Sequence, residues 1–96
     1  MAKWKYTIHS GTALRDAINN EDMEQVIECL LSCCVELNRK LRGEDKTDYG
    51  LELDDMFVTL SCYEPTEDDE ENEEIINEYL EQFYDICDDV RAFIKL

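Results

Sequence analysis

The stretch of sequence that decides the fold is EDMEQVIECLLSCCVELNRKLR, residues 21–42. Its apolar residues recur every three or four positions, which places their side chains on one face of an α-helix. They are Met23, Val26, Ile27, Leu30, Leu31, Cys34, Leu37 and Leu41. Acids open the stretch and bases close it, as the helix dipole favours, and Gly43 follows as a C-cap. We predict a long helix whose apolar stripe packs against other helices.

Three other segments repeat apolar residues at the same spacing. A short helix is predicted at residues 12–19, after a cap at Ser10 or Thr12, and longer helices at residues 48–63 and 72–94. Their apolar residues are Leu14, Ala17 and Ile18 in the first, Tyr49, Leu53, Met56, Phe57 and Leu60 in the second, and Ile76, Tyr79, Leu80, Phe83, Ile86, Cys87, Val90, Phe93 and Ile94 in the third.

The length of the chain, 96 residues, provides for one domain with one core. The predicted fold class is therefore all-α, a compact bundle of three long helices and one short helix in a single domain covering residues 1–96. Gly50 costs about 1 kcal/mol relative to Ala near the start of its helix, which makes that boundary uncertain in position. Pro65 ends the same helix, and Arg91 and Lys95 are expected in the last turns of the final one.

The opening segment, residues 1–9, follows a different pattern. Trp4, Tyr6 and Ile8 alternate with polar residues, which is typical of a half-buried strand. A single strand in an otherwise helical chain has no internal pairing partner. The segment is predicted either to cross the bundle as an extended strap, with Trp4 and Tyr6 as plugs, or to pair with another chain.

The charge of the chain excludes one class of function. Nine Lys and Arg stand against 25 Asp and Glu, a net charge of −16. Binding to nucleic acid or to an anionic membrane needs clustered positive charge, so neither is expected as a direct partner. No apolar run approaches the roughly 18 residues of a membrane span, and the start MAKWKYTIHSG lacks the layout of a secretory signal. We expect a soluble, cytoplasmic protein.

The net negative charge arises entirely from one half of the chain. Residues 1–42 hold six bases and six acids, whereas residues 43–96 hold three bases and 19 acids. Eight acids fall within residues 64–74, which we predict to stay solvated, either as an acidic loop or as a frayed helix start. On the final helix, acids follow one another at intervals of four, three, four and three residues. These are Glu74, Glu78, Glu81, Asp85 and Asp88, which we call the acidic stripe.

The acidic stripe has two interpretations. It is either a solvated face that keeps a small protein in solution, or a docking surface for a basic partner such as a nucleic-acid-binding protein. No Lys or Arg interrupts the stripe before Arg91. It therefore lacks the ion pairs between residues three or four apart that each stabilise a helix by about 0.2 to 0.5 kcal/mol. The candidate partner-binding residues are the stripe together with Asp89, Glu67, Asp68, Asp69, Glu70 and Glu71.

Residues suited to catalysis or metal binding are few. The five cysteines form no C-x-x-C pair, and His9 is the single histidine, expected at the surface or as a cap. Reduced thiols packed in the core fit the odd cysteine count better than disulfides. The acidic run lacks the glycine and ligand spacing of an EF-hand loop. We predict no catalytic residues, no metal, no cofactor and no enzymatic activity.

Two stretches, SGTALRDAI running into residues 23–31 and YLEQFYDICDDVR at residues 79–91, resemble small acidic proteins encoded by phages and mobile elements of Gram-positive bacteria. The resemblance is one of general character and covers about half of the chain. It implies a class that includes anti-CRISPR and anti-restriction proteins, which imitate DNA to inhibit host nucleases. It assigns a role to no particular residue.

Two functions follow from the sequence. The first is a small acidic protein-binding module whose last helix and preceding acidic residues engage a basic protein surface, as in a nucleic-acid-mimicking inhibitor of a host defence protein. The alternative is a structural interaction protein or homodimer subunit. In that case Trp4, Tyr6 and Ile8 pair or pack across the interface and the acids only solvate the outside.

Overall fold

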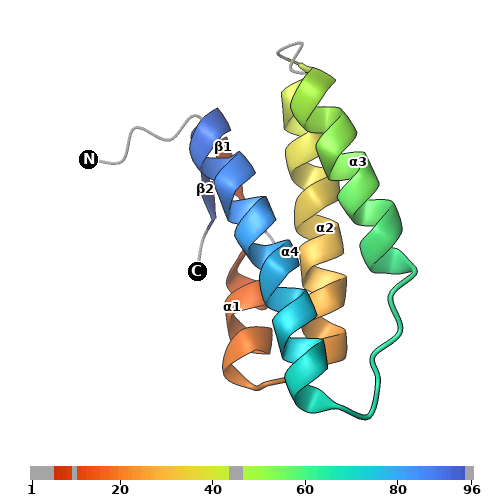
Figure 1. Ribbon diagram of the computed structural model, residues 1–96. Coiled ribbons are helices and arrows are strands. Elements are labelled where there is room, and N and C mark those ends of the chain that lie inside the picture. Colours follow the sequence, from red (N-terminus) through yellow and green to blue (C-terminus); the bar gives the residue numbers. More distant parts are fainter. Residues whose placement is uncertain (1–5, 10, 44–46, 95–96) are drawn as a thin grey trace.

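A central helix, α2 (Met23–Arg42), organises the fold in the computed structural model, which describes residues 6–9, 11–43 and 47–94. It contacts each of the other helices: α1 (Gly11–Asn19), α3 (Thr47–Ser61) and α4 (Asp69–Val90). In Figure 1, α3 lies on one side of α2, while α1 and two short strands lie on the other. The predicted all-helical bundle of three long helices and one short helix is confirmed.

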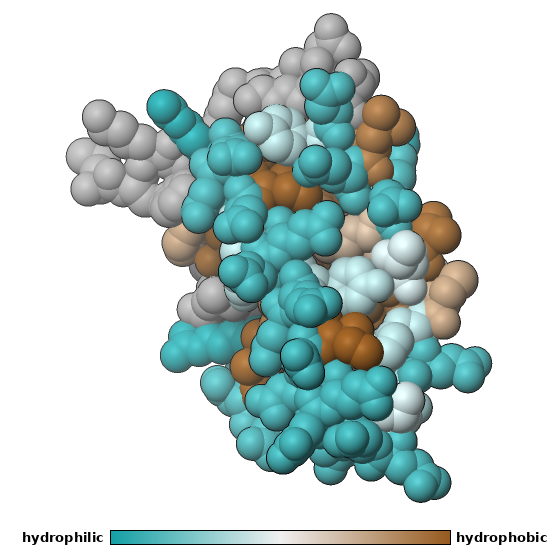
Figure 2. All heavy atoms as spheres, in the orientation of Figure 1, coloured by the Kyte–Doolittle hydropathy of each residue, from teal (hydrophilic) through white to brown (hydrophobic). Residues whose placement is uncertain are grey.

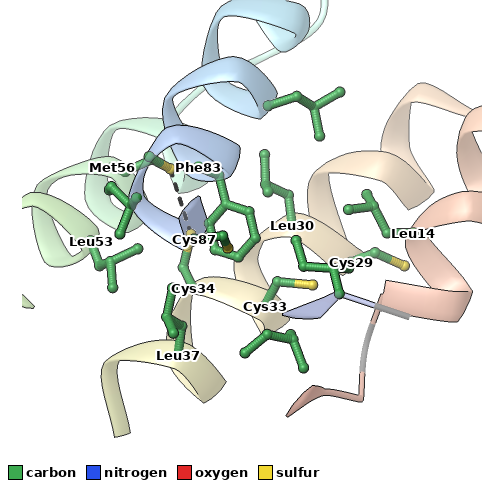
Figure 3. Close-up of a cluster of buried hydrophobic side chains, with 14 of the residues drawn as sticks. Leu14, Cys29, Leu30, Cys33, Cys34, Leu37, Leu53, Met56, Phe83 and Cys87 are labelled. Atoms are coloured by element: carbon green, nitrogen blue, oxygen red, sulfur yellow. Dashed lines mark hydrogen bonds between the residues drawn. The ribbon is translucent and has the colours of Figure 1, made fainter. Parts of the chain in front are cut away.

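The core is formed by the inner faces of all four helices (Figure 3). Phe83 of α4 and Leu30 of α2 are fully buried there. The Cys34 thiol donates to the Met56 sulfur at 3.6 Å, which joins α2 to α3. Two residues predicted on apolar faces depart from them, because Ile18 of α1 and Phe93 near the C-terminus each remain 39% exposed.

The starts of α2 and α4 are fixed by aspartate caps. Asp22 accepts the Gln25 N–H at 3.3 Å, so α2 begins two residues later than predicted. Asp68 accepts the N–H groups of Glu70 and Glu71, and α4 therefore begins at Asp69. The prediction of an acidic loop over residues 64–74 is wrong for residues 69–74, where the alternative of a helix start is correct, because a capped N-terminus stabilises carboxylates in the first helical turn.

Gly50 has a packing role that its helix propensity does not reveal. A Cβ atom at this position would lie 3.0 Å from Oδ1 of Asn38, on the facing helix α2. The Asn38 amide group donates to Asp54 at 2.6 Å and so ties the two helices together. The absence of a side chain at residue 50 thus permits a close, hydrogen-bonded approach of α3 to α2.

The opening strand, β1 (Tyr6–Ile8), pairs in parallel with β2 (Ala92–Ile94) of the same chain. This corrects the expectation that the strand lacks an internal partner. It also corrects the predicted helix over residues 72–94, which ends at Val90 because Arg91 adopts the left-handed conformation with φ of 58°. Ile8 and Ile94 are buried and belong to the hydrophobic core. Arg91 is therefore a C-cap, outside the last turn of the helix.

Four further expectations concern residues near the two ends of the chain. The exposed His9 fits the predicted surface or cap position, and its backbone N–H donates to the Glu36 carboxylate at 2.8 Å. Trp4, Ser10 and Lys95 lie outside the described residues.

Candidate protein-binding surface

Helix α4 has two sharply different faces. Its inner face buries a run of residues at helical spacing: Asn72, Ile76, Leu80, Phe83, Ile86, Cys87 and Val90. At 100° per residue, the acidic stripe lies on the opposite side of the helix. All five of its carboxylates are exposed. Figure 2 shows this outer surface as a largely hydrophilic face of the molecule. The predicted stripe is thus a real, solvent-facing feature of the fold.

The charge on α4 is of one sign throughout. The sequence of the helix, DEENEEIINEYLEQFYDICDDV, contains ten acids and no Lys or Arg. From Glu74 to Asp88 the stripe runs for about 21 Å along the helix axis at 1.5 Å per residue. Like charges at intervals of three and four residues repel one another, and each such pair costs about 0.2 to 0.5 kcal/mol.

The position of these acids along the helix separates them into two groups. Asp69, Glu70 and Glu71 occupy the first turn, where the positive end of the helix dipole stabilises them. Asp85 and Asp88 lie in the last turns, where the dipole disfavours negative charge. No basic residue of α4 offsets them there. Helix stability explains the first group and not the second.

The start of the acidic segment is held in place by a hydrogen-bonded cluster. The buried side chain of Asn72 donates to the carbonyl of Thr66 at 2.7 Å and accepts the Thr66 N–H at 2.8 Å. The Tyr63 hydroxyl donates to the same side chain. Sequence periodicity does not reveal this cluster, although Asp68 followed by Glu71 is a capping signal that could have located the helix start.

The candidate residues are not all equally available for binding. Glu67, Asp69, Glu70 and Glu71 are exposed, but the Asp68 carboxylate is engaged in capping α4. Asp89 faces α3, where it accepts the Tyr49 hydroxyl at 3.4 Å. The negative charge of Asp89 is the main cause that raises the pKa of Tyr49. The structure therefore brings the five stripe residues together and assigns Asp68 and Asp89 additional local roles.

Four of the five cysteines gather inside the bundle. Cys29, Cys33, Cys34 and Cys87 are buried, and all five cysteines are free (Figure 3). Burial raises the pKa of Cys33, Cys34 and Cys87 to about 12, so these thiols remain protonated and unreactive near neutral pH. Cys62 is exposed at the end of α3, contrary to the expected core position.

Within residues 6–9, 11–43 and 47–94, no group of three His, Cys, Asp or Glu side chains is placed to hold a metal ion. None of the helices described is long and apolar enough to cross a membrane.

Comparison with known proteins gives one partial match. No protein-family model and no solved structure matches the chain. A stretch of 54 residues, 56% of this chain, is 37% identical to the GTPase-activating protein gyp2 of Schizosaccharomyces pombe. The stretch spans 8% of that protein's length. The similarity thus concerns a small part of a much larger protein.

Proposed function

We propose that this protein binds a basic surface of another protein through the acidic stripe of α4. The partner is a nucleic-acid-binding protein, and the stripe occupies the groove in which that protein would hold phosphates. The resemblance to small acidic phage and mobile-element proteins favours an inhibitor of a host defence protein, of the anti-CRISPR or anti-restriction type. The partial similarity to a GTPase-activating protein adds no catalytic role to this proposal.

The observation that carries the proposal is the unrelieved charge of the outer face of α4. All five stripe carboxylates are exposed, and the sequence of α4 contains no Lys or Arg. A face that served only for solubility would gain stability by mixing both signs of charge. Carboxylates in the last turns, including Asp85 and Asp88, lower the stability of the helix that presents them. A partner's cations would compensate for that cost on binding.

The spacing of the charges also favours a phosphate-binding groove. Successive stripe carboxylates rise by roughly 4.5 to 6 Å, and phosphates along one strand of DNA rise by about 3.4 Å. The two series are of the same order, so Lys and Arg side chains arranged along a groove for phosphates can reach successive carboxylates. Association of this kind is fast at low salt and weakens as salt screens the charges.

The test removes charge without changing shape. Glu78→Gln, Glu81→Gln and Asp85→Asn are combined in one variant, and binding is measured against a panel of basic nucleic-acid-binding proteins at about 50 and 300 mM salt. We expect the triple variant to fold normally and to lose at least about tenfold in affinity, or roughly 1.4 kcal/mol. The matched control combines Glu24→Gln with Glu28→Gln on the exposed face of α2 and should change little.

A bound panel member should also release its nucleic acid when this protein is added, and the triple variant should compete less well. If a partner is found whose affinity and salt dependence are the same for the triple variant and the wild type, the stripe is only a solvated face.

The alternative, self-association, has one observation in its favour. Leu51 and Val58 are 69% and 58% exposed on the outer face of α3, and Val35 of the adjacent α2 is 42% exposed. Apolar residues are visible along this edge of the molecule in Figure 2. The mass of the protein in solution, measured by sedimentation, distinguishes a dimer from a monomer. The in-chain pairing of β1 moves the candidate dimer surface away from Ile8, which is buried within the chain.

A further inference from the structure

A cavity of about 270 Å³ opens where α1, the start of α2 and the N-terminal half of α4 meet. Its apolar walls include Val26 of α2 with Ile76 and Leu80 of α4. These side chains belong to the hydrophobic core and are between 2% and 9% exposed. A ligand or side chain that approaches from solvent can therefore reach the edge of the hydrophobic core through this cavity.

The mouth of this cavity is negatively charged. Glu21, in the turn between α1 and α2, and Asp69 and Glu73 of α4 line it and are exposed. None of the described residues that line the cavity is Lys or Arg. Ile18 also stands at the mouth and is 39% exposed. An apolar interior with an acidic rim is complementary to an apolar side chain carried between cations.

The cavity adjoins the acidic stripe. Glu73 and Asn77 line both the cavity and an open hollow on the outer side of α4. The same hollow is lined by Glu74, Glu78 and Glu81, three members of the stripe. A segment that lies along the stripe and continues toward the start of α4 thus reaches the cavity without leaving the surface.

We propose that this cavity receives one apolar or aromatic side chain from the Lys- and Arg-rich segment of the partner that lies along the acidic stripe. The inference rests on the proposed function and names the contact that gives it specificity. The cations that flank the inserted side chain lie near Glu21, Asp69 and Glu73. Binding energy in such interfaces is concentrated in side chains that fill a pocket, whereas exposed charges chiefly speed association.

The size of the cavity favours a side chain over a cofactor. Pockets for drug-sized ligands and cofactors measure about 300 to 1,000 Å³ and enclose most of the ligand. The present cavity lies just below that range and is bordered by exposed carboxylates. It has room for a leucine or phenylalanine side chain. Such a side chain would displace water from the apolar walls.

The experiment uses two lysine-rich peptides, KKKFKKK and KKKAKKK, as probes. They carry the same charge and differ only in the central side chain. We expect the wild-type protein to bind the phenylalanine peptide about tenfold more tightly, because a buried aromatic ring gains that much from leaving water. The dissociation constants are measured by fluorescence anisotropy with labelled peptides.

Two substitutions on α4 test whether the tighter binding of the phenylalanine peptide arises in the cavity. Asn77→Trp places a large side chain at the cavity without changing charge, and it should abolish the difference in affinity between KKKFKKK and KKKAKKK. Gln82→Trp adds the same side chain to an exposed position that does not line the cavity, and it should keep the preference. Equal affinity of the wild type for both peptides overturns the inference, as does a preference that persists in Asn77→Trp.

Should Asn77→Trp fail to fold, the wild type still decides the question. The phenylalanine peptide should shift the NMR methyl signals of Ile18, Met23 and Ile76, and the alanine peptide should not. If both peptides shift them equally, or neither does, the inference is wrong.

The peptides also separate this inference from the proposed function. The triple stripe variant should weaken the binding of both peptides by a similar factor and keep the ratio between them. A wild type that binds both peptides equally, with binding that depends on the stripe, overturns the cavity inference alone. A triple variant that binds both as the wild type does overturns the proposed function, while the ratio between the peptides still reports on the cavity.

Discussion

Helices α2 and α4 are nearly equal in length and have similar inner faces, but they carry charge in different ways. In α2, Glu24 stands in the first turn and Arg39, Lys40 and Arg42 stand in the last turn, so each charge suits the helix dipole. In α4, acids occupy both ends and no base is present. The charges at the two ends of α2 are explained by the stability of the helix. Those at the end of α4 are not, which is why α4 is the better candidate for a binding surface.

The largest expected effect is a loss of stability at high pH. It comes from the inner faces, because α2 and α4 both bury cysteine side chains there. Burial disfavours the thiolate and raises the pKa of Cys33 and Cys34 of α2 and of Cys87 of α4 from the ordinary 9.0 to about 12. Above pH 9 the unfolded chain therefore loses these protons first. The free energy of unfolding should be fully retained below pH 9 and fall between pH 9 and 12, by up to about 1.4 kcal/mol per thiol for each pH unit.

Urea denaturation at about pH 8 and pH 10.5 measures this loss. A midpoint that does not change between the two would contradict the burial of the thiols. As an independent check near pH 8, iodoacetamide should modify Cys62 in the native protein and reach the other four cysteines only after unfolding.

An intermediate effect is expected from the outer faces, with opposite signs on the two helices. The pair Asp85→Asn and Asp88→Asn removes charge that the dipole of α4 disfavours, and should raise the free energy of unfolding by about 0.5 to 1 kcal/mol. The pair Arg39→Gln and Arg42→Gln removes favourable charge from α2 and should lower it by a similar amount.

Both pairs are compared by urea denaturation at low and high salt, and the two changes should shrink together as salt increases. Equal signs on the two helices would show that dipole and repulsion do not govern their outer charges. In that case Asp85 and Asp88 would not lower the stability of α4, and its outer charge would no longer favour a binding surface.

The smallest effect is expected at the C-terminal caps of α2 and α4. The left-handed backbone conformation, which favours glycine, is adopted there by Arg91 and not by Gly43. Gly43 caps α2 in the right-handed conformation with φ of −67°, whereas Arg91 caps α4 in the left-handed conformation. A Cβ atom at residue 43 would make only an ordinary contact, 3.5 Å from the Lys40 carbonyl. Gly43→Ala and Arg91→Gly should each stabilise the protein by about 0.5 kcal/mol, the first by restricting the unfolded chain and the second by relieving backbone strain.

Thermal unfolding of the two single variants and of their combination measures these effects. The two positions are far apart along the chain and in different helices, so their contributions should add. Destabilisation by Arg91→Gly would show that the arginine side chain contributes more than its backbone strain costs.

The helices of this fold could be predicted from the sequence because their apolar residues repeat over several turns. The ends were less accessible, since they depend on single side chains. Asp68 moves the start of α4 into the acidic run, and the left-handed Arg91 turns Phe93 and Ile94 from a predicted helix into a strand. The pairing of β1 with β2 joins distant segments, and no local pattern encodes it.

The candidate site divides in the same way. Spacing alone placed the acidic stripe on one face of α4, because the helical period fixes the directions of its side chains. The cavity beside it could not be found from periodicity. It depends on how Ile18 of α1, Glu21 of the following turn and the first turns of α4 meet in three dimensions. The exposure of Ile18, a residue predicted to face the core, is the sign that this corner is incompletely filled.

The parallel pairing of β1 with β2 also has a consequence for the order of folding. It joins Tyr6 to Ala92 and so closes a loop that contains all four helices. Bringing together segments that far apart costs about 4 kcal/mol of chain entropy if the intervening residues are still unfolded. Once the helices have packed, the two strand segments are already close together, so most of this chain entropy has already been lost. We therefore expect the strands to join last in folding and to separate first in unfolding, so that the sheet acts as a latch on a bundle already formed.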